Sequence, residues 1–538
     1  MKFLASMTRI GCFLLLVTGP AWAQSFTAAV RGVVTDPGGA AVPNAKVIIT
    51  EAERNVQHPT TTDSQGRYYV SALPPGQYTM TVEAKGFRGY SQRAFPLLVQ
   101  QQATIDVQLQ VGEVSSVVEV QGAAPLVNTT ISNLGQVIEN KYILSLPNLG
   151  RDSMSLVYLT PGVVGSGGRR GDSSTNFVAN GSRNSTSDVL VDGVTVVTVE
   201  QNSGVTDLKF SPSVDTVQEF KMQTNFFSAE YGQTGGAVVN MVTRSGANDL
   251  HGTGYYFLRD NALNANDWFA NRAGRALPAF HRDQFGGVLG GPIIRNKTFF
   301  FGGYEYTKQE SPTTSTITVP TARQRQGDFS QTFTNSGDPV TIYNPFDTVT
   351  TSAGTVRQRF RCDAAGVPLP VNAQNRQDQN AGSPCNVIPQ SMLDPVALKA
   401  LSYLPLPNQQ GAAFTNTANW FGSGVNQNSG HQINIKLNHN FNERTSASGR
   451  YSQARNNGTN PNLFGDDNPA YWTGGPSATR THAMVAELNH TFSPTTLVTF
   501  RYGFTYSNFH RDPLVGYGFD VTTLGLPASM GETATHQV

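Results

Sequence analysis

The stretch from Tyr231 to Leu258 reads YGQTGGAVVNMVTRSGANDLHGTGYYFL, and the pattern of the chain changes within it. Two short predicted strands, 237–244 and 252–258, flank Ser245-Gly246-Ala247-Asn248, a composition typical of turns. The first strand closes a front half of short segments. The second opens a series of β-patterned segments that continues through the rest of the sequence. We interpret the stretch as the junction between a compact, packed front half and a strand-rich rear half.

Composition favours strands and excludes one class of partner. Lys and Arg together number 38 and Asp and Glu 37, so the chain lacks the positive field that nucleic-acid binding needs. Only 14% of the residues are charged and 53 are glycine, which suits strands and turns better than helices. We therefore expect a mainly β fold and no nucleic acid among the partners.

Residues 1–23 have the organisation of a secretory signal peptide. Lys2 and Arg9 form the basic flank, residues 10–17 the apolar core, and Ala21-Trp22-Ala23 a small-x-small cleavage site. No later stretch has about 18 or more apolar residues in a row, the length that a membrane helix needs. An exported protein without such a helix is either soluble or a β-barrel.

Few residues are candidates for chemistry. The sequence has no His-Glu-x-x-His, Gly-x-Ser-x-Gly or Cys-x-x-Cys motif, and its nine histidines are scattered. We therefore expect no catalytic, cofactor-binding or metal site and no enzyme activity. Cys362 and Cys385 remain once the leader is removed, and an oxidising compartment favours a disulfide between them. Two free thiols are the alternative.

Residues 27–110 predict a β-sandwich. Short β-runs recur between turn sequences such as Asp36-Pro37-Gly38-Gly39, and apolar residues alternate with polar ones, as at Tyr78, Met80 and Val82. The expected strands are 28–34, 45–50, 68–72, 78–82 and 104–109. The unit resembles a carboxypeptidase regulatory-like domain through Gly32-Val33-Val34-Thr35-Asp36, Asp63-x-x-Gly66-x-Tyr68, Leu73-Pro74-Pro75-Gly76-x-Tyr78 and Gly86-Phe87. This resemblance implies a non-catalytic module.

The rear half contains seven candidate strands with lengths near the 9–11 residues of a tilted membrane strand. They are 252–258, 283–290, 298–306, 432–441, 445–453, 482–492 and 496–508. In 432–441 the apolar Ile433 and Ile435 alternate with the polar Asn434 and Lys436. One apolar and one polar face also fit a soluble sandwich, so alternation alone does not decide between the two.

The lengths of the connections favour a membrane barrel. Short connections at 293–297, 442–444 and 493–495 alternate with long ones at 259–282, 307–431 and 454–481, and another long segment begins at 509. Tight turns on one rim and long loops on the other are typical of outer-membrane barrels. We expect aromatic girdles near the strand ends, from Phe441, Phe492, Tyr304 and Tyr306, with His431, His439, His482 and His490 on the outward face.

The front and rear halves together resemble TonB-dependent outer-membrane receptors of the Oar-like group. The matching front-half motifs are Leu144-x-Leu146-Pro147-x-x-Gly150-Arg151, Thr160-Pro161-Gly162, Asp188-Val189-Leu190-Val191-Asp192-Gly193 and Gly235-Gly236-x-Val238-x-Asn240. The rear-half motifs are Arg259-Asp260-Asn261-Ala262-Leu263-Asn264 and Phe285-Gly286-Gly287-x-Leu289-Gly290-Gly291-Pro292. The resemblance implies an internal plug domain that is enclosed by a transmembrane β-barrel.

The expected fold class is therefore mainly β, with an N-terminal β-sandwich, an α+β plug domain and the first strands of an incomplete antiparallel transmembrane β-barrel. The expected domains are a signal peptide (1–23), the regulatory-like sandwich (27–110), a linker (111–122), the plug (123–250) and a partial barrel with long extracellular loops (251–538). Plugged transporters have about 22 strands, so seven strands predict that this sequence is a fragment. The alternative is a native short form that needs partners to close the barrel.

The linker contains a candidate partner-binding segment. Residues 111–122 read VGEVSSVVEVQG, and Val117, Val118, Glu119 and Val120 form a short, lightly charged β-prone run. The run resembles a TonB box, which a TonB-type energy-coupling protein of the inner membrane captures by strand addition. The alternative is a last strand or linker of the sandwich.

The resemblance implies a receptor that imports an unidentified ligand by energy-coupled plug remodelling. Its expected place is the outer membrane of a Gram-negative-type bacterium, in contact with lipid, with the N-terminal domain in the periplasm. Carbohydrate, peptide and metal-chelate ligands all stay open. The alternative function is surface adhesion or matrix organisation, in which the barrel is an anchor and the 307–431 loop carries the activity.

Overall fold

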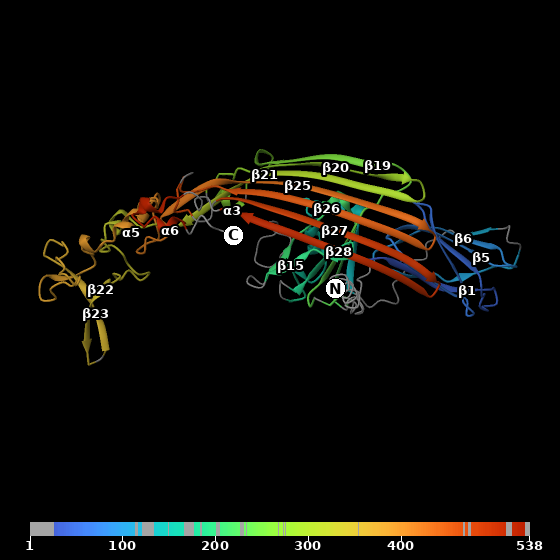
Figure 1. Cartoon of the computed structure of the whole chain (residues 1–538), viewed down its shortest axis with the longest axis horizontal. Coiled ribbons are helices and arrows are strands. Elements are labelled where there is room, and N and C mark those ends of the chain that lie inside the picture. The colour runs from blue at the N-terminus through green and yellow to red at the C-terminus, as the bar shows by residue number, and fades with distance from the viewer. Residues whose placement is uncertain are drawn as a thin grey trace, which may run out of the picture.

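The computed structural model describes residues 26–532, apart from 113–116, 121–133, 149, 166–176, 183–185, 201–204, 226, 228–230, 233, 267, 273, 275, 353, 466–467, 472–474 and 513–518. The leader expected at 1–23 lies outside these residues. Figure 1 shows an N-terminal β-domain (blue), an internal domain (teal to green), a wall of long strands (green to red) and a loop domain (yellow to orange) at the other end. The predicted mainly β fold is confirmed.

The N-terminal domain is built from two sheets. Its strands are β1 (Ala28–Thr35), β2 (Lys46–Glu51), β3 (Val56–Thr61), β4 (Arg67–Leu73), β5 (Gly76–Glu83), β6 (Gly89–Leu97), β7 (Gln102–Thr104), β8 (Val107–Gln108) and β9 (Val117–Val120). One sheet has the order β4-β1-β7, with β8 also paired to β1, and the other the order β3-β2-β5-β6-β9. Val30, Val47, Tyr78 and Phe95 are fully buried between them.

Two strands of this domain, β3 and β6, were not predicted. β3 reads VQHPTT and contains Pro59, which cannot donate a ladder hydrogen bond and is tolerated because β3 is an edge strand. β6 reads GYSQRAFPL, and a register shift where it pairs with β5 breaks its alternation. Both strands lack the regular period-two pattern on which the sequence prediction depended.

The internal domain combines a five-stranded sheet with short helices. Its elements are β10 (Leu134–Glu139), α2 (Asn140–Ser145), η1 (Ser153–Leu159), β11 (Val163–Gly165), β12 (Phe177–Ala179), β13 (Asp188–Val191), β14 (Val194–Thr195), β15 (Val197–Glu200), β16 (Val205–Leu208), η3 (Val214–Thr216), β17 (Val217–Asn225) and β18 (Val238–Thr243). The main sheet has the order β10-β17-β18-β13-β14. Met154, Val189, Phe220, Met222 and Val239 form its core.

The wall is one antiparallel sheet of seven strands in chain order. They are β19 (His251–Asp260), β20 (His281–Ile294), β21 (Thr298–Ile317), β25 (Trp420–Asn442), β26 (Thr445–Asn460), β27 (Gly475–Ser493) and β28 (Thr496–Arg511). All seven predicted strands are present, and the sheet they form is open. The expected length of 9–11 residues is too short for six of them, because polar segments such as 307–317 and 420–430 continue the pairing beyond the apolar band.

The two faces of the wall are inverted relative to a sheet in a water-soluble protein. Ile435 and Leu437 point outward and are 48% and 47% exposed, whereas the polar Asn434 and Lys436 between them are buried against the internal domain. Outward apolar side chains facing no protein match a sheet that is surrounded by hydrocarbon. The predicted alternation is therefore confirmed, with its apolar face outward.

The four wall histidines lie on the outward face, as predicted, at two levels along the strands. His431 and His482 were expected near strand ends but lie inside β25 and β27, because both strands continue beyond the apolar band. Nearer the short turns, the ring nitrogen Nδ1 of His439 is 2.8 Å from the Thr298 hydroxyl, and that of His490 is 2.8 Å from the Thr445 hydroxyl. At the other level, the Tyr304 hydroxyl is 2.9 Å from Nδ1 of His431, and the Tyr451 hydroxyl is 2.8 Å from Nδ1 of His482. Tyr304 and Tyr306 lie inside β21 and not near its end, because that strand continues to Ile317.

The two rims of the wall differ as predicted. Three-residue or two-residue turns at 295–297, 443–444 and 494–495 join strands at one rim, and long connections at 261–280, 318–419 and 461–474 join them at the other. The shorter elements of the long connections and of the C-terminal segment are η4 (Asn261–Leu263), α3 (Trp268–Arg272), α4 (Ala322–Arg325), β22 (Tyr343–Thr351), β23 (Gly354–Cys362), β24 (Ser383–Cys385), η5 (Gln390–Met392), α5 (Pro395–Ser402), η6 (Val521–Leu524) and α6 (Ser529–Glu532).

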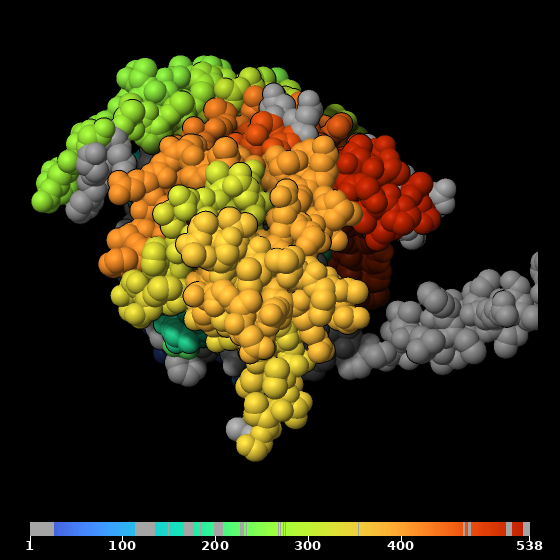
Figure 2. All heavy atoms as spheres, turned by 90° about the vertical axis from the view of Figure 1, so that its left-hand side faces the viewer, coloured from blue at the N-terminus to red at the C-terminus, as the bar shows by residue number. Residues whose placement is uncertain are grey.

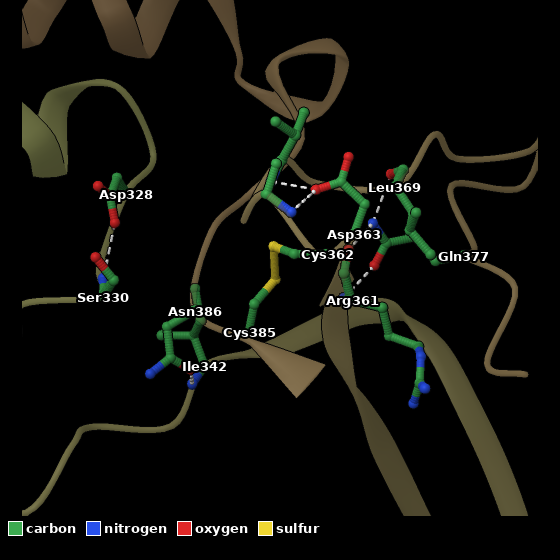
Figure 3. The surroundings of a disulfide bond; sticks show 12 residues. Asp328, Ser330, Ile342, Arg361, Cys362, Asp363, Leu369, Gln377, Cys385 and Asn386 are labelled. Carbon is green, nitrogen blue, oxygen red and sulfur yellow. Dashed lines mark hydrogen bonds between the residues drawn. A yellow bond between two sulfur atoms is a disulfide. The ribbon is translucent and has the colours of Figure 1, made fainter. Parts of the chain in front are cut away.

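The 318–419 connection is a folded loop domain that lies in front of the wall end in Figure 2. Its β22–β23 hairpin projects away from the wall, and a disulfide joins Cys362 to Cys385 beside it (Figure 3). The Gln377 side chain accepts a hydrogen bond from the Arg361 amide and donates one to the Leu369 carbonyl. No helix in the part of the chain that the structure describes is long and apolar enough to cross a membrane.

Candidate functional site

The contact between the internal domain and the wall centres on the turn that joins β13 to β14. Asp192 and Gly193 both have positive φ, 50° and 75°, which is the conformation of a type I′ hairpin turn. The Asp192 side chain is only 3% exposed. Its carboxylate accepts hydrogen bonds from the Thr243 amide at 2.9 Å and the Thr243 hydroxyl at 2.6 Å. The turn therefore presents one buried negative charge to the wall.

Two cations of the wall neutralise this charge. Arg450 Nε of β26 lies 2.8 Å from one carboxylate oxygen of Asp192, and Lys436 Nζ of β25 lies 3.3 Å from the other. Lys436 also donates to the Thr243 carbonyl at 3.0 Å. Lys436 and Arg450 are paired residues on adjacent strands, so the wall register places both charges at one level. We refer to Asp192, Thr243, Lys436 and Arg450 as the Asp192 cluster.

Electrostatics hold the Asp192 cluster in its charged form. Burial acts to raise the pKa of the Asp192 carboxyl, but the charges of Lys436 and Arg450 outweigh it and hold that pKa below its usual range. A buried ion pair adds little net stability, yet removing one partner leaves an unpaired buried charge that is strongly destabilising. The cluster therefore specifies where the internal domain sits more than it adds to its folding energy.

A second contact joins the internal domain to the other side of the wall. Arg151 pairs with Asp215 inside the internal domain and lies over the rings of Tyr255 and Phe257 of β19, at 5.1 and 3.9 Å. Arg282 of β20 donates to a carbonyl of the same segment, that of Gly150, at 2.7 Å. Cation–π and charged contacts thus hold both sides of the internal domain.

The N-terminal domain contacts the internal domain through a buried carboxyl group. The Val99 amide donates to Glu219 of β17 at 2.6 Å, and Lys221 donates to the Val99 carbonyl at 3.3 Å. Burial raises the pKa of Glu219 to about 8, and the nearby Glu139 acts in the same direction, while the Val99 amide and Lys221 act to lower it. Glu219 therefore binds a proton at neutral pH.

The structure places the TonB-box-like residues Val117, Val118, Glu119 and Val120 in strand β9. This strand pairs in parallel with β6 of the N-terminal domain, with Val117 opposite Gly89 and Val120 opposite Gln92. Its other edge has no strand partner among the described residues. The segment is therefore an edge strand of the sandwich, which was the alternative open in the sequence.

The remaining sequence predictions concern chemistry. The two cysteines are joined in the loop domain, away from the Asp192 cluster. Within the described ranges, no three His, Cys, Asp or Glu side chains are grouped to hold a metal ion. Sequence reasoning used Asp192 only as a turn residue and Lys436 only as part of a polar face. A carboxylate in a predicted turn and a lysine on the inward face of a predicted wall strand are opposite charges, and this is the signal that could have predicted their pairing.

This geometry defines a class of protein: an apolar outward wall with a polar inner face packed on an internal domain is the arrangement of a plugged outer-membrane β-barrel protein. The profile of the family described as outer membrane beta barrel domain matches residues 242–538, more than half of the chain, so the chain belongs to that family and is located in the outer membrane. The profile of the carboxypeptidase regulatory-like domain matches residues 29–110.

Among curated proteins, the chain is similar to the TonB-dependent transporter Oar of Myxococcus xanthus. The two are 30% identical over 305 residues, which is 54% of this chain and 27% of that transporter. The chain therefore spans about a quarter of the length of this relative. The relative is a transporter and not an enzyme.

Two solved structures are also similar over much of the chain. The outer membrane transporter YddB from Escherichia coli is 8% identical, with a TM-score of 0.40, over 70% of this chain and 39% of that one. The ferric enterobactin receptor of Pseudomonas aeruginosa, as a mutant, is 13% identical, with a TM-score of 0.36, over 69% of this chain and 40% of that one.

Proposed function

We propose that the protein imports a ligand across the outer membrane, driven by a TonB-type protein that remodels the internal domain. The observation that carries this proposal is how the internal domain is held. Its buried core consists almost wholly of its own residues, and the wall contributes one fully buried member, Ala483. Polar contacts such as the Asp192 cluster hold it in the wall. A domain with its own core and polar contacts to its surroundings can move without unfolding the wall.

The location of β9 at the edge of the N-terminal domain supports binding of a TonB-type energy-coupling protein there. β9 is a four-residue edge strand, and among the described residues its outer edge pairs with no other strand. Strand addition needs such an edge. The short turns of the wall lie on the side of the N-terminal domain. Short turns face the periplasm in outer-membrane barrels, which supports a periplasmic position for that domain, where a TonB-type protein acts. Removal of β9 from β6 would free the connection to the internal domain, which starts at β10.

The partner interaction can be tested without knowing the ligand. We expect the full-length protein in detergent to bind the periplasmic domain of a TonB-type protein from the same bacterium. Glu119→Pro removes a backbone donor from β9 and should weaken binding about tenfold or more, as measured by surface plasmon resonance. Glu119→Ala keeps the backbone donor and should bind like the native protein. Equal binding of both variants would remove β9 from the mechanism.

Transport itself needs a cell-based measurement. In cells that express the full-length protein, deletion of 116–121 should abolish uptake and leave surface binding unchanged. Uptake that survives this deletion would contradict energy coupling through β9.

A second candidate function, surface adhesion, is favoured by the loop domain. The β22–β23 hairpin projects from the wall and carries the exposed apolar side chains Phe346, Val349 and Val356. In this case, deletion of 343–362 should abolish attachment of cells to a surface, while Glu119→Pro leaves attachment unchanged. Attachment that depends on β9 and not on the hairpin would exclude this candidate.

A further inference from the structure

A cavity of about 620 Å³ lies between the internal domain and the wall, on the side of the long connections. The segment 208–211 and Asp152 form its floor, together with Glu305 of β21, whose strand partner Gln432 donates to the Ser211 carbonyl. The parts of β21, β25, β26 and β27 beyond this level form its sides. The volume is within the range of ligand-binding pockets. Its lining includes Glu305, Thr307, Gln309, Asn428, Gln432, Asn456, Ser477 and Thr479.

The sides of the cavity carry no charge beyond the floor. The wall register places Thr307 opposite Gly430, Gln309 opposite Asn428, and Asn456 opposite Thr479, so all three pairs share the inward face. The charged residues of these segments, Lys308, Glu310, Arg455 and Arg480, occupy the alternate positions and therefore the outward face. Among the described lining residues above the floor, the inward side chains are amides and hydroxyls, with Gly430 and Gly458 between them.

The charges of the floor already have partners within the protein. The Asp152 carboxylate accepts a hydrogen bond from the Met154 amide at 3.0 Å, and Glu305 accepts one from the Tyr255 hydroxyl at 2.8 Å. Lys209 also has an interaction within the chain. The charges of the floor are therefore engaged within the protein, and the neutral sides face the space above it.

Two glycines allow two amide side chains to lie across the strands. A Cβ atom on Gly430 would stand 2.6 Å from Oδ1 of Asn456, and one on Gly458 would stand 2.8 Å from Oδ1 of Asn428. Each amide thus occupies the space that a glycine on the neighbouring strand leaves open. Both asparagines are exposed to the cavity, and no hydrogen bond among the described residues uses their side chains. Their donors and acceptors are available to a ligand.

We propose that this cavity binds an uncharged oligosaccharide, an assignment that rests on the import function proposed above. A sugar has neighbouring hydroxyl groups that both donate and accept, and an amide side chain has one acceptor oxygen and two donor hydrogens to match them. A peptide or an anionic metal chelate would lose hydration of its charges without gaining an opposite charge from the sides. The neutral sides therefore select against both alternatives.

The test measures binding and not uptake, using the full-length protein in detergent on an array of neutral, uronic-acid and sulfated glycans. Neutral glycans should bind. Asn428→Leu and Asn456→Leu should each weaken this binding about tenfold, because each removes hydrogen bonds to the sugar. Thr459→Leu, on the outward face of β26, is the matched control and should leave it unchanged. Circular dichroism checks that each variant is folded, and the milder Gly430→Ala, which displaces the Asn456 amide, should weaken binding as well.

Three results would overturn the proposal: binding of charged glycans only, no binding of any glycan, or neutral-glycan binding that Asn428→Leu and Asn456→Leu leave unchanged. A peptide pool and ferric citrate are measured in parallel, and binding of either that depends on Asn456 would also overturn it. Failure of the proposed import function gives a different result. If neutral glycans bind but the Glu119→Pro variant still binds the TonB-type protein, energy coupling through β9 is wrong, while the proposed ligand class is unaffected.

Discussion

The N-terminal domain and the internal domain are of similar kind but are held in different ways. The N-terminal domain closes two sheets over a continuous apolar core that includes Val47, Tyr78 and Phe95. The internal domain has an apolar core of its own, but it meets the wall through the Asp192 cluster and through Arg151. The first arrangement resists any separation of its parts. In the second, the internal domain has its own core and meets the wall along a polar surface.

The largest expected effect tests the apolar side of this comparison. Phe95→Ala removes a fully buried ring from the sandwich core and should destabilise that domain by about 3–5 kcal/mol. The loss is measured by chemical denaturation of the full-length protein, with proteolytic cleavage of the N-terminal domain reporting the denaturant concentration at which that domain unfolds. Tyr69→Ala, at an exposed position of β4, is the control and should have little effect. Equal effects of the two changes would mean that this core does not stabilise the domain.

A somewhat smaller effect is expected at the polar contact. Asp192→Ala leaves Lys436 and Arg450 buried without a counter-charge. It should destabilise the packing of the internal domain against the wall by about 3 kcal/mol. The expected readout is faster proteolysis within the internal domain, while the wall strands stay protected. Asp63→Asn breaks an exposed ion pair with Arg67 and should change neither rate. Loss of protection in the wall strands would show that the internal domain and the wall unfold together.

Replacing both sides of the contact sharpens the same test. Asp192→Asn combined with Lys436→Met and Arg450→Leu removes all three charges of the contact, and Asn accepts the positive φ of position 192. The variant should restore the position of the internal domain in the wall, since well-packed apolar residues often replace buried charges without loss. We expect this triple variant to lose transport, because the contact would no longer release. Normal transport with restored stability would show that the charges serve only to position the internal domain.

The smallest effect concerns pH at the contact between the N-terminal and internal domains. Because the folded-state pKa of Glu219 is raised to about 8, the stabilisation linked to its proton is full below its ordinary value of 4.5 and is lost as pH rises through about 8. Hydrogen exchange at Val99, corrected for the intrinsic effect of pH, should accelerate over this interval. Glu219→Gln should flatten the dependence, and Asp249→Asn should not. If the Glu219→Gln variant kept the native pH dependence of hydrogen exchange at Val99, another group would be responsible for the effect.

The sequence predicted the wall better than the contacts that the wall makes. All seven wall strands and the alternation of rims followed from period-two patterns and turn lengths, because lipid on one face forces a regular apolar row such as Ile433, Ile435 and Leu437. Strand ends were predicted too short, since the polar continuation of β21 beyond Thr307 has no apolar row. In the N-terminal domain, β3 and β6 were missed for the same reason.

The candidate site was predictable only in part. The run from Val117 to Val120 was identified as a β-prone segment, but its pairing with β6 depends on a contact with residues 89–92, which no local pattern encodes. The Asp192 cluster joins residues that are more than 240 positions apart in the sequence, Asp192 and Lys436. Such a pair is set by the register of the wall and by the seating of the internal domain, and both are tertiary properties.

The histidines of the wall repeat as a set. Thr298, Tyr304, His431 and His439 on β21 and β25 are matched, contact for contact, by Thr445, Tyr451, His482 and His490 on β26 and β27. Each set spans eight residues from one histidine to the next, about 26 Å along a strand. With the tilt of about 35–45° that barrel strands have, this is roughly 20 Å in height, within an apolar band of about 25 Å. The two strand pairs thus keep the same separation between their two histidine levels, so polar groups recur at matching heights along the apolar outer face.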